Sequence, residues 1–405
     1  MSAHHAMDSE QSEMLPRTFP SELKHEERSD QADIFKKNVA LIRYKYEQLE
    51  PSERQQRART LSQRLHVSEL ELVAAQCGDM HAIQLASQPR DIFSQMGRLG
   101  RVMALTRNDH CVAEKHGTYS SIQVQGAVGL VLGPDIDLRM FFKSWKHVWA
   151  VEEHGRNSLQ FFDQTGQAIH KIYCTAQSNR AEYVAIVGQY RVQTPVWPEI
   201  FQTVPETASD ERKTHLSEDD AHLSGNLTQQ DCESQTGHLT ARARLRNAWL
   251  AMKDTHDFYP LLRDFNITRL GALRAVGEDL ALSVIPEVVE DMLRRVSRSA
   301  LPIMCFVSNQ SMIQIHTGPA VNIQRTGPWL NVLDPDFNLH LDTTQIASVW
   351  IVHKPTIDGW VTSLELFDHS GQLIAQFFGA RKPGSPELLQ WRDLLHALGT
   401  QVADK

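Results

Sequence analysis

The segment around His256 contains residue types that could bind a ligand. In NAWLAMKDTHDFYPLLRDFNITRLGALRAVGEDLAL (residues 247–282), one helical stripe holds Trp249, Met252 and His256, and a second holds Phe258, Leu261, Leu262 and Phe265. If the second stripe packs on the core, His256 points away from it, beside a large apolar patch. Pro260 indicates a helix start or kink just after this histidine. Such an imidazole can face a bound apolar ligand, although a surface or hydrogen-bonded histidine is the simpler interpretation of these residues alone.

Basic residues at the ends of predicted elements form a second candidate set. Arg269 lies at a helix start, Lys354 at a strand-to-turn junction and Arg381 after the last strand. Cations in such places can bind carboxylates, and solvated surface charge is the alternative. Gln376 and Phe378 alternate on the last strand, so we expect them to face the same side.

Common catalytic motifs are missing from the sequence. It contains no GxxxxGK[ST], HExxH, GxSxG or GxGxxG pattern, and we interpret GAVGLVLG (126–133) as a packed strand or bulge. The five cysteines form no CxxC pair, which argues against a disulfide scaffold or a cysteine zinc site.

Three pairs of segments indicate a tandem duplication. FFDQTGQAIHKIY (161–173) matches LFDHSGQLIAQFF (366–378) at an offset of 205 residues, and GPDIDLRMFFKSWKHVWAV (133–151) matches DPDFNLHLDTTQIASVWIV (334–352) at 201. LHVSELELVAA (65–75) matches FNITRLGALRA (265–275) at 200. The change from 201 to 205 predicts a longer hairpin loop in the second copy.

Each half begins with helical periodicity and then changes to strands. Pro51 predicts a helix start, and Ser68 followed by Glu71 resembles a capping box. IVHKPTIDGWVTSLELFDHSGQLIAQFF reads as three strands joined by turns. We therefore predict an α+β fold made of two similar halves, each with helices packed on an antiparallel sheet, the two sheets stacked centrally.

Composition divides the 405 residues into four parts. We expect a polar N-terminal extension (1–30), a first repeat (31–203), a polar linker (204–240) and a second repeat (241–405), with both polar segments irregular. The net charge of −8 argues against nucleic acid or anionic membranes as partners but permits a local basic pocket. No apolar run approaches the ~20 residues that span a membrane, and the N-terminus lacks a secretory signal, so we expect a cytoplasmic protein.

These motifs resemble the HemS/HmuS family (ChuS- and PhuS-like) of bacterial cytoplasmic haem-handling proteins. The resemblance covers roughly residues 35–398 and has the same tandem duplication. It rests on W-x-A-M-x-D-x-H-x-F (249–258) with the following NITR, RNDHCVAEKHGTY (107–119), DIDLRMFFKSWKHVWAV, LQFFDQTGQAIHKIY, KPTIDGWVTSLELFDHSGQLIAQFFGAR and QWRDLL.

The resemblance implies a haem site and a role for each candidate residue. His256 would be the axial ligand of the haem iron, and Arg139 would donate a hydrogen bond on the distal face, which makes both the implied catalytic residues. The implied surroundings of the porphyrin and its propionates are Arg269, Lys354, Gln376, Phe378 and Arg381. Arg139 belongs to the first half and His256 to the second, so the haem is expected in a cleft between the halves.

Two positions depart from the family pattern. Phe378 stands where relatives often carry tyrosine, and Ala113 replaces a usual histidine. The first loses a hydroxyl contact while keeping a ring that can pack on porphyrin, and the second leaves any role of that position in doubt.

Two functions are compatible with the implied site. One is oxidative haem degradation with O₂ and an external reductant, which releases iron. The other is a non-enzymatic carrier that sequesters imported haem and passes it to a haem oxygenase. Besides haem, the partners implied are an inner-membrane haem importer and a haem oxygenase or reductase. A two-domain protein that binds some other ligand is the third interpretation.

Overall fold

The computed structural model describes residues 21–198, 235–382 and 384–401, and it describes no side chains for residues 21–31 and 235–240. Most of the predicted extension (residues 1–20) and of the predicted linker (204–234) lies outside the described residues. Helix α1 begins at Ser21 and helix α7 at Gln235, so the last part of each segment expected to be irregular is helical instead. The first part, SELKHEERSD (21–30), is rich in Glu, Leu, Lys and Arg, which favour helices even without an apolar stripe, and the second, QTGHLT (235–240), precedes the helix-favouring run ARARLRNAWL.

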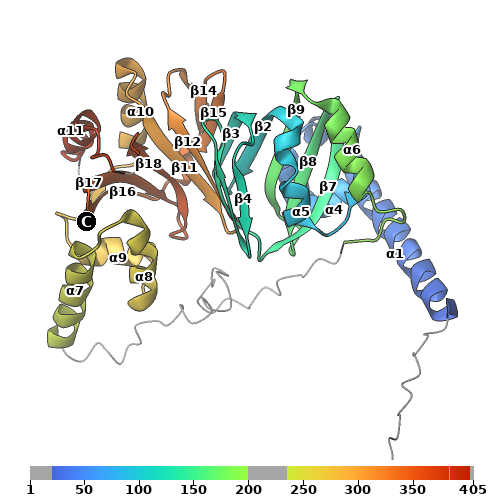
Figure 1. The fold of residues 1–405 in the computed structure, drawn as a ribbon, viewed down its shortest axis with the longest axis horizontal. Coiled ribbons are helices and arrows are strands. Elements are labelled where there is room, and N and C mark those ends of the chain that lie inside the picture. Colours follow the sequence, from blue (N-terminus) through green and yellow to red (C-terminus); the bar gives the residue numbers. More distant parts are fainter. Residues whose placement is uncertain (1–20, 199–234, 383, 402–405) are drawn as a thin grey trace, which may run out of the picture.

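The first half begins with one long helix and several short ones and continues with strands, as predicted (Figure 1). Its helices are α1 (Ser21–Glu47), α2 (Pro51–Arg54), α3 (Ala58–Leu65), α4 (Glu69–Ala75), α5 (Pro89–Phe93), the 3-10 helix η1 (Met96–Leu99) and α6 (Arg180–Tyr190). Its strands are β1 (His81–Leu85), β2 (Gly100–Arg107), β3 (Cys111–Thr118), β4 (Ile122–Gln125), β5 (Val128–Leu132), β6 (Asp137–Phe141), β7 (Trp145–Glu153), β8 (Arg156–Asp163) and β9 (Ala168–Ser178).

The second half repeats this order. Its helices are α7 (Gln235–Leu250), η3 (Thr255–Asp257), α8 (Phe258–Asp264), α9 (Arg269–Val276), α10 (Val288–Ser299), η4 (Thr343–Gln345) and α11 (Leu389–Leu398). Its strands are β10 (Ala281–Val284), β11 (Ile303–Asn309), β12 (Met312–Gly318), β13 (Ile323–Thr326), β14 (Trp329–Leu333), β15 (Phe337–Asp342), β16 (Ser348–Thr356), β17 (Gly359–Phe367) and β18 (Leu373–Gly379). No helix in the described ranges is both long and apolar enough to cross a membrane.

Each half lends three strands to the sheet of the other half. The first sheet has the order β1-β7-β8-β9-β2-β3-β15-β14-β13, and the second has β10-β16-β17-β18-β11-β12-β6-β5-β4. All the pairings are antiparallel, which confirms the α+β class with two similar halves. The exchange was not anticipated, because sequence periodicity identifies strands but not their distant partners.

The two sheets contact each other at the centre of the molecule, where β2 and β3 lie beside β11 and β12 (Figure 1). The side-chain amide of Asn108 donates to the carbonyls of Ser308 and Ile374 at 3.0 and 2.8 Å. Asn309, at the matching position of the second half, donates to the carbonyls of Arg107 and Ile169 at 3.2 and 2.9 Å. These reciprocal bonds satisfy buried carbonyls and fix the sheets against one another.

Local signals at the helix starts are confirmed. Ser68 accepts from the N–H of Glu71 at 3.1 Å while the Glu71 carboxylate accepts from the N–H of Ser68 at 2.8 Å, so the capping box is formed. Helix α2 begins at Pro51. The predicted longer loop in the second repeat is wrong in one respect. The turns after β7 and β16 both contain two residues, and the four extra residues extend the turn end of the β16–β17 hairpin by two residues on each strand.

Candidate functional site

His256 lies in the short 3-10 helix η3, between α7 and α8. Its side chain is 90% exposed. Asp254 caps η3, and its Oδ1 accepts from the backbone N–H of His256 at 2.8 Å and lies 2.5 Å from His256 Nδ1. The N–H of His256 lowers the pKa of Asp254, against burial and with help from the imidazole and from the charge of Arg381. A ring held at Nδ1 by a carboxylate presents Nε2 outwards, which is the usual second-sphere arrangement of a metal-binding histidine.

The long β16–β17 hairpin supports the loop that carries His256. The backbone N–H of Ile357, at the hairpin turn, donates to the carbonyl of Lys253 at 2.9 Å. This contact depends on the two-residue extension of each strand, which the β7–β8 hairpin lacks. The second half therefore has a structural element that positions the His256 loop.

His256 does not lie on the helical stripe with Trp249 and Met252 that the sequence predicted. Helix α7 ends at Leu250, so residues 249–256 do not share one helix. Trp249 and Met252 are buried in the same core cluster as Phe258, and the Trp249 indole N–H donates to the carbonyl of His353 at 2.9 Å. The prediction that His256 points away from the core is confirmed, but Trp249 and Met252 do not flank it on a surface patch.

Three of the predicted ligand-binding residues converge on a buried carboxylate, Glu365. Arg269 forms a two-pronged ion pair with it, with Nε and Nη2 donating at 2.6 and 2.7 Å. Lys354 Nζ donates to Glu365 Oε1 at 2.7 Å, and Gln376 donates to the same oxygen at 3.1 Å. The expectation that cations at these element ends bind a carboxylate is thus met within the protein itself.

Burial gives this group strong electrostatic coupling. Although burial alone would raise it, the charges of Arg269 and Lys354 hold the pKa of Glu365 well below its usual range. Burial lowers the pKa of Lys354 to about 8, against the attraction of Glu365. Both cations also lie over the ring of Phe258, at 4.8 Å for Arg269 and 4.6 Å for Lys354. With Lys354 protonated, these three charges leave one net positive charge beside the His256 loop.

Arg381 has a donor without a partner. Its Nη2 lies 3.7 Å from Oδ2 of Asp358, in the hairpin turn that contacts the His256 loop. Its Nη1 is buried and makes no hydrogen bond. A buried guanidinium nitrogen in this state is a candidate donor to a ligand, since buried polar atoms are normally paired.

Arg139, Gln376 and Phe378 lie on one face of the second sheet. Arg139 of β6 lies opposite Ile313 of β12, and Ile315, two residues further along β12, lies opposite Phe306 of β11. Phe306 in turn lies opposite Gln376 of β18. Because paired residues share a face, the alternation predicted for Gln376 and Phe378 is confirmed and extends to Arg139. Arg139 reaches this sheet only because β6 is exchanged between the halves.

Arg139 is not joined to the Glu365 group. It is ion-paired with Asp137, two residues away on the same strand. Its strand β6 lies three strands from β18, roughly 14 Å at the usual spacing between strands. The structure thus places the predicted residues around one sheet face, with His256 and the cations at one side and Arg139 at the other.

An apolar strip on this face was missed by sequence reasoning. Phe306 stacks edge-to-face with Phe378 at 5.1 Å between ring centroids, and both are half-buried. On β5 and β6, around Arg139, the exposed or half-buried apolar side chains are Val128, Leu130, Leu132 and Phe141. The alternation in residues 128–132 signals a strand with one apolar face, but it does not show that this face stays uncovered. Exposed apolar surface of this kind is typical of ligand sites.

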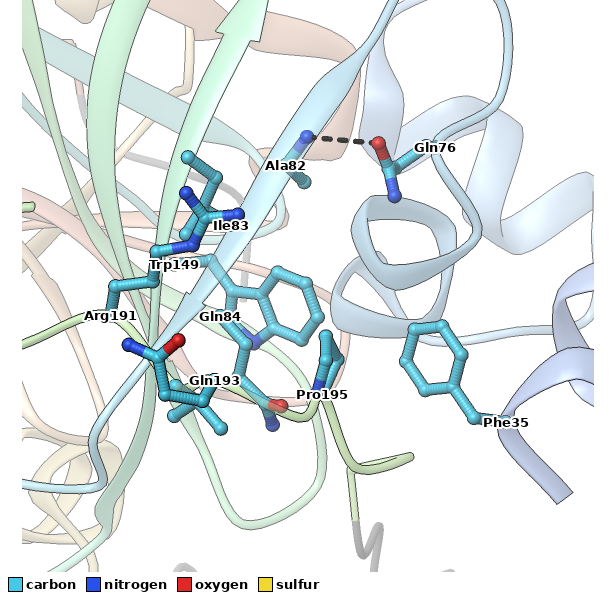
Figure 2. A pocket seen from close by; sticks show the side chains of 10 residues that line it. Phe35, Gln76, Ala82, Ile83, Gln84, Trp149, Arg191, Gln193 and Pro195 are labelled. Atoms are coloured by element: carbon cyan, nitrogen blue, oxygen red, sulfur yellow. Dashed lines mark hydrogen bonds between the residues drawn. The ribbon is translucent and has the colours of Figure 1, made fainter. Parts of the chain in front are cut away.

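The two cavities found in the structure do not coincide with this face. One, of about 130 Å³, lies in the first half between α1, β1 and residues 191–195, and is lined by Phe35, Trp149 and Arg191 among others (Figure 2). The other, of about 330 Å³, is also in the first half, beside Tyr46 and Cys77. Neither of these two is lined by a predicted ligand-binding residue; Arg139, Gln376 and Phe378 lie instead along the sheet face.

Ala113, the position that departs from the family pattern, is a core residue here. Its side chain is buried in the core of the second half, and its carbonyl accepts from the side-chain amide of Gln314 at 3.1 Å. It is on β3, in the first sheet, whereas Arg139 and the Glu365 group are on the second sheet.

Comparison with known proteins shows the family to which the chain is similar. The family model described as "Haemin-degrading HemS.ChuX domain" matches residues 66–190 and again residues 266–398. The hemin transport protein HmuS of Yersinia pestis is 36% identical over 346 residues, which cover 84% of this chain and 92% of that protein. Apo-PhuS, a heme-binding protein from Pseudomonas aeruginosa, has a TM-score of 0.77 and 39% identity, covering 89% of this chain and 99% of that one.

The heme degrading enzyme ChuS of Escherichia coli O157:H7 has a TM-score of 0.75 and 29% identity, with 89% of this chain and 99% of that chain covered. The two matches of the family model together span more than half of the chain, in the two halves that the repeat defines. The chain therefore belongs to the HemS/ChuX family of haemin-degrading domains.

Proposed function

We propose that this protein binds haem on the open face of its second sheet and degrades it oxidatively with O₂ and an external reductant. Haem is here both ligand and substrate. The observation that carries the proposal is the His256 imidazole, exposed at Nε2 and held at Nδ1 by Asp254, next to a group with excess positive charge.

The residues present fit a haem. A porphyrin is flat and apolar with two carboxylates at one edge, and this face offers an apolar strip with cations beside it. The unpartnered Nη1 of Arg381 is a donor that a propionate can satisfy. His256 would supply the single axial imidazole, and Arg139 on the far strands a hydrogen-bond donor over the porphyrin.

The role of each residue follows from its position. Asp254 holds the imidazole in the tautomer with Nε2 unprotonated, so that the nitrogen can bind iron. Phe306 and Phe378 exclude water from one part of the face. Oxidative ring opening needs electrons from outside, because the sequence has no flavin- or nicotinamide-binding motif.

A non-enzymatic carrier is the second candidate. It is favoured by the 90% exposure of His256, because an exposed axial ligand allows haem to leave by exchange with a partner. Relatives bear both kinds of name, a hemin transport protein and a heme degrading enzyme. Cytoplasmic location, a haem importer as source, and a haem oxygenase or reductase as partner belong to this proposal as well.

Turnover in the presence of catalase separates the two functions. The hemin complex is mixed with a reductant and O₂, and the Soret band and the products are followed. Loss of the band to a verdin-type product that persists with catalase supports degradation. If catalase abolishes the loss, the reaction is coupled oxidation by free peroxide, and the carrier function is supported instead.

A further inference from the structure

Glu365 is a buried carboxylate whose hydrogen-bonding capacity is used inside the protein. It is fully buried and accepts from Arg269, Lys354 and Gln376, and also from the hydroxyl of Ser363 at 2.9 Å. It therefore cannot contact a ligand on the sheet face. Its influence on a ligand has to pass through the groups that it holds.

Arg269 is the group through which Glu365 can act. It is the first residue of helix α9, where the positive end of the helix dipole disfavours a cation, and its side chain is 26% exposed. Nε and Nη2 are directed at Glu365 and the guanidinium lies over Phe258, which leaves Nη1 as the remaining donor edge. Lys354 is only 3% exposed and donates to Glu365, so it adds positive charge to the group from beneath the protein surface.

We propose that Glu365 is a positioning residue for recognition of a ligand carboxylate. It fixes Arg269 against Phe258 so that the Nη1 edge is presented to a haem propionate, while Lys354 supplies the second positive charge that leaves the group net positive. This inference rests on the proposed function, since it assumes that the ligand is haem. It gives Lys354 an indirect role, in contrast to the direct contact implied by the family resemblance.

The first half lacks this device. Across the hairpin strands, Trp149 pairs with Gln160 and Trp350 with Glu365, so a neutral amide stands where the second half has the carboxylate. The helix that matches α9 is α4, and it starts with Glu69 in place of Arg269. The Glu69 carboxylate is itself buried and paired with Lys171, so this helix start presents no arginine to a propionate.

Two probes that differ only in the carboxylates test the proposal: hemin and hemin dimethyl ester, in which both propionates are uncharged. In Glu365→Gln the amide nitrogen is a donor that faces the donors of Arg269 or Lys354. The Arg269 guanidinium is then no longer held in place. We expect its hemin affinity to fall about 10- to 100-fold, the value of one charged hydrogen bond. Its affinity for the ester should change by less than about two-fold.

The control is Glu69→Gln, which removes the carboxylate of a similarly buried ion pair in the first half, with Lys171 at 2.9 Å. It should leave the affinity for both probes unchanged. An equal loss for hemin and the ester in Glu365→Gln would overturn the proposal, since it would show a purely structural role, and an unchanged hemin affinity would overturn it too.

Arg269→Gln keeps the proposal falsifiable if Glu365→Gln does not fold. We expect the same loss, selective for hemin over the ester, from this partly exposed position, and a loss that does not distinguish the two probes would overturn the proposal. Failure of the proposed function has a different signature: the wild-type protein would then give no Soret shift with hemin at all.

Discussion

The two halves place opposite charges at the same junction between helix and sheet. In the first half, helix α4 begins with Glu69, which is paired with Lys171 on β9 at 2.9 Å. In the second half, helix α9 begins with Arg269, which is paired with Glu365 on β17 at 2.6 Å. The carboxylate has moved from the helix to the strand, and the cation from the strand to the helix.

This inversion separates a junction that serves stability from one that fits ligand binding. A carboxylate at a helix N-terminus interacts favourably with the helix dipole, whereas an arginine there does not. The second half compensates for the arginine at its helix N-terminus with the buried Glu365 carboxylate, which is surrounded by donors. Local rules broken with a nearby compensation are typical of functional sites. On the strand, Glu153 takes the place of Lys354 in the first half, and the second cation near Glu69 is Arg59 of helix α3, at 3.7 Å.

The largest expected effect comes from removing each buried carboxylate. Glu365→Leu leaves Arg269 and Lys354 without their anion, and we expect the free energy of unfolding to fall by about 3–5 kcal/mol. Glu69→Leu removes the hydrogen bond from Lys171 and a looser ion pair with Arg59 at 3.7 Å, so its loss should be smaller. Urea unfolding of the two variants measures the difference. A larger loss in Glu69→Leu would break the comparison.

The second largest expected difference between the halves is the acid sensitivity of their cores. His170 is buried between the hydroxyls of Thr106, at 2.9 Å, and Tyr119, at 2.5 Å. Burial lowers the pKa of His170 from 6.5 to about 3. Below pH 6.5 the unfolded chain binds a proton that the folded protein does not, so stability falls as the pH falls from 6.5 towards 3, by about 2–3 kcal/mol at pH 4.5.

The repeat places Ala375, Val307 and Ala320 at the three positions, and burial lowers the pKa of the second-half residue His316 less far, to about 4. Hydrogen exchange at pH 4.5 and pH 7 should therefore show acid-induced opening that begins around β2 and β9. His170→Gln should remove about one proton from the pH dependence of stability between these values. An unchanged pH dependence in this variant would rule out His170 as the source.

A smaller effect is expected from Arg139, whose counterpart in the repeat is His340. Arg139→Ala should keep hemin affinity within about three-fold but slow reductant-driven turnover roughly ten-fold, as a lost donor over the porphyrin would. His340→Ala is the matched control, because His340 lies on the first sheet, hydrogen-bonded to Asn331 at 2.7 Å. Normal turnover by Arg139→Ala would remove its assignment to the distal side.

Much of the fold could be predicted from the sequence because its signals are local. The repeat offsets, the capping box at Ser68 and the strand periodicity all depend on neighbouring residues, and each was confirmed. The exchange of β6 could not be predicted, because antiparallel pairing between distant strands leaves no local pattern. The two-residue extension of β16 and β17 was detected only as a change in offset and was assigned to the loop.

The candidate site was predicted by residue but not by arrangement. Residue types and spacing singled out His256, Arg269, Lys354 and Arg381 and placed Gln376 and Phe378 on one face, and the resemblance added Arg139 and gave each residue its role. Glu365 was missed, because a lone carboxylate in the strand WVTSLELF gives no sign that it is buried or that three donors reach it. Such convergence depends on the register of four elements, which the sequence does not state.

The most direct test of the account is a hemin titration of the wild-type protein beside His256→Ala, followed by the Soret band. We expect a saturable complex in the wild type, with an affinity lowered about ten-fold or more and an altered band position in the variant, because the iron loses its imidazole. A wild-type protein that gives no Soret shift, or a variant that titrates with the same affinity and the same spectrum, would contradict the assignment of haem to the face beside His256.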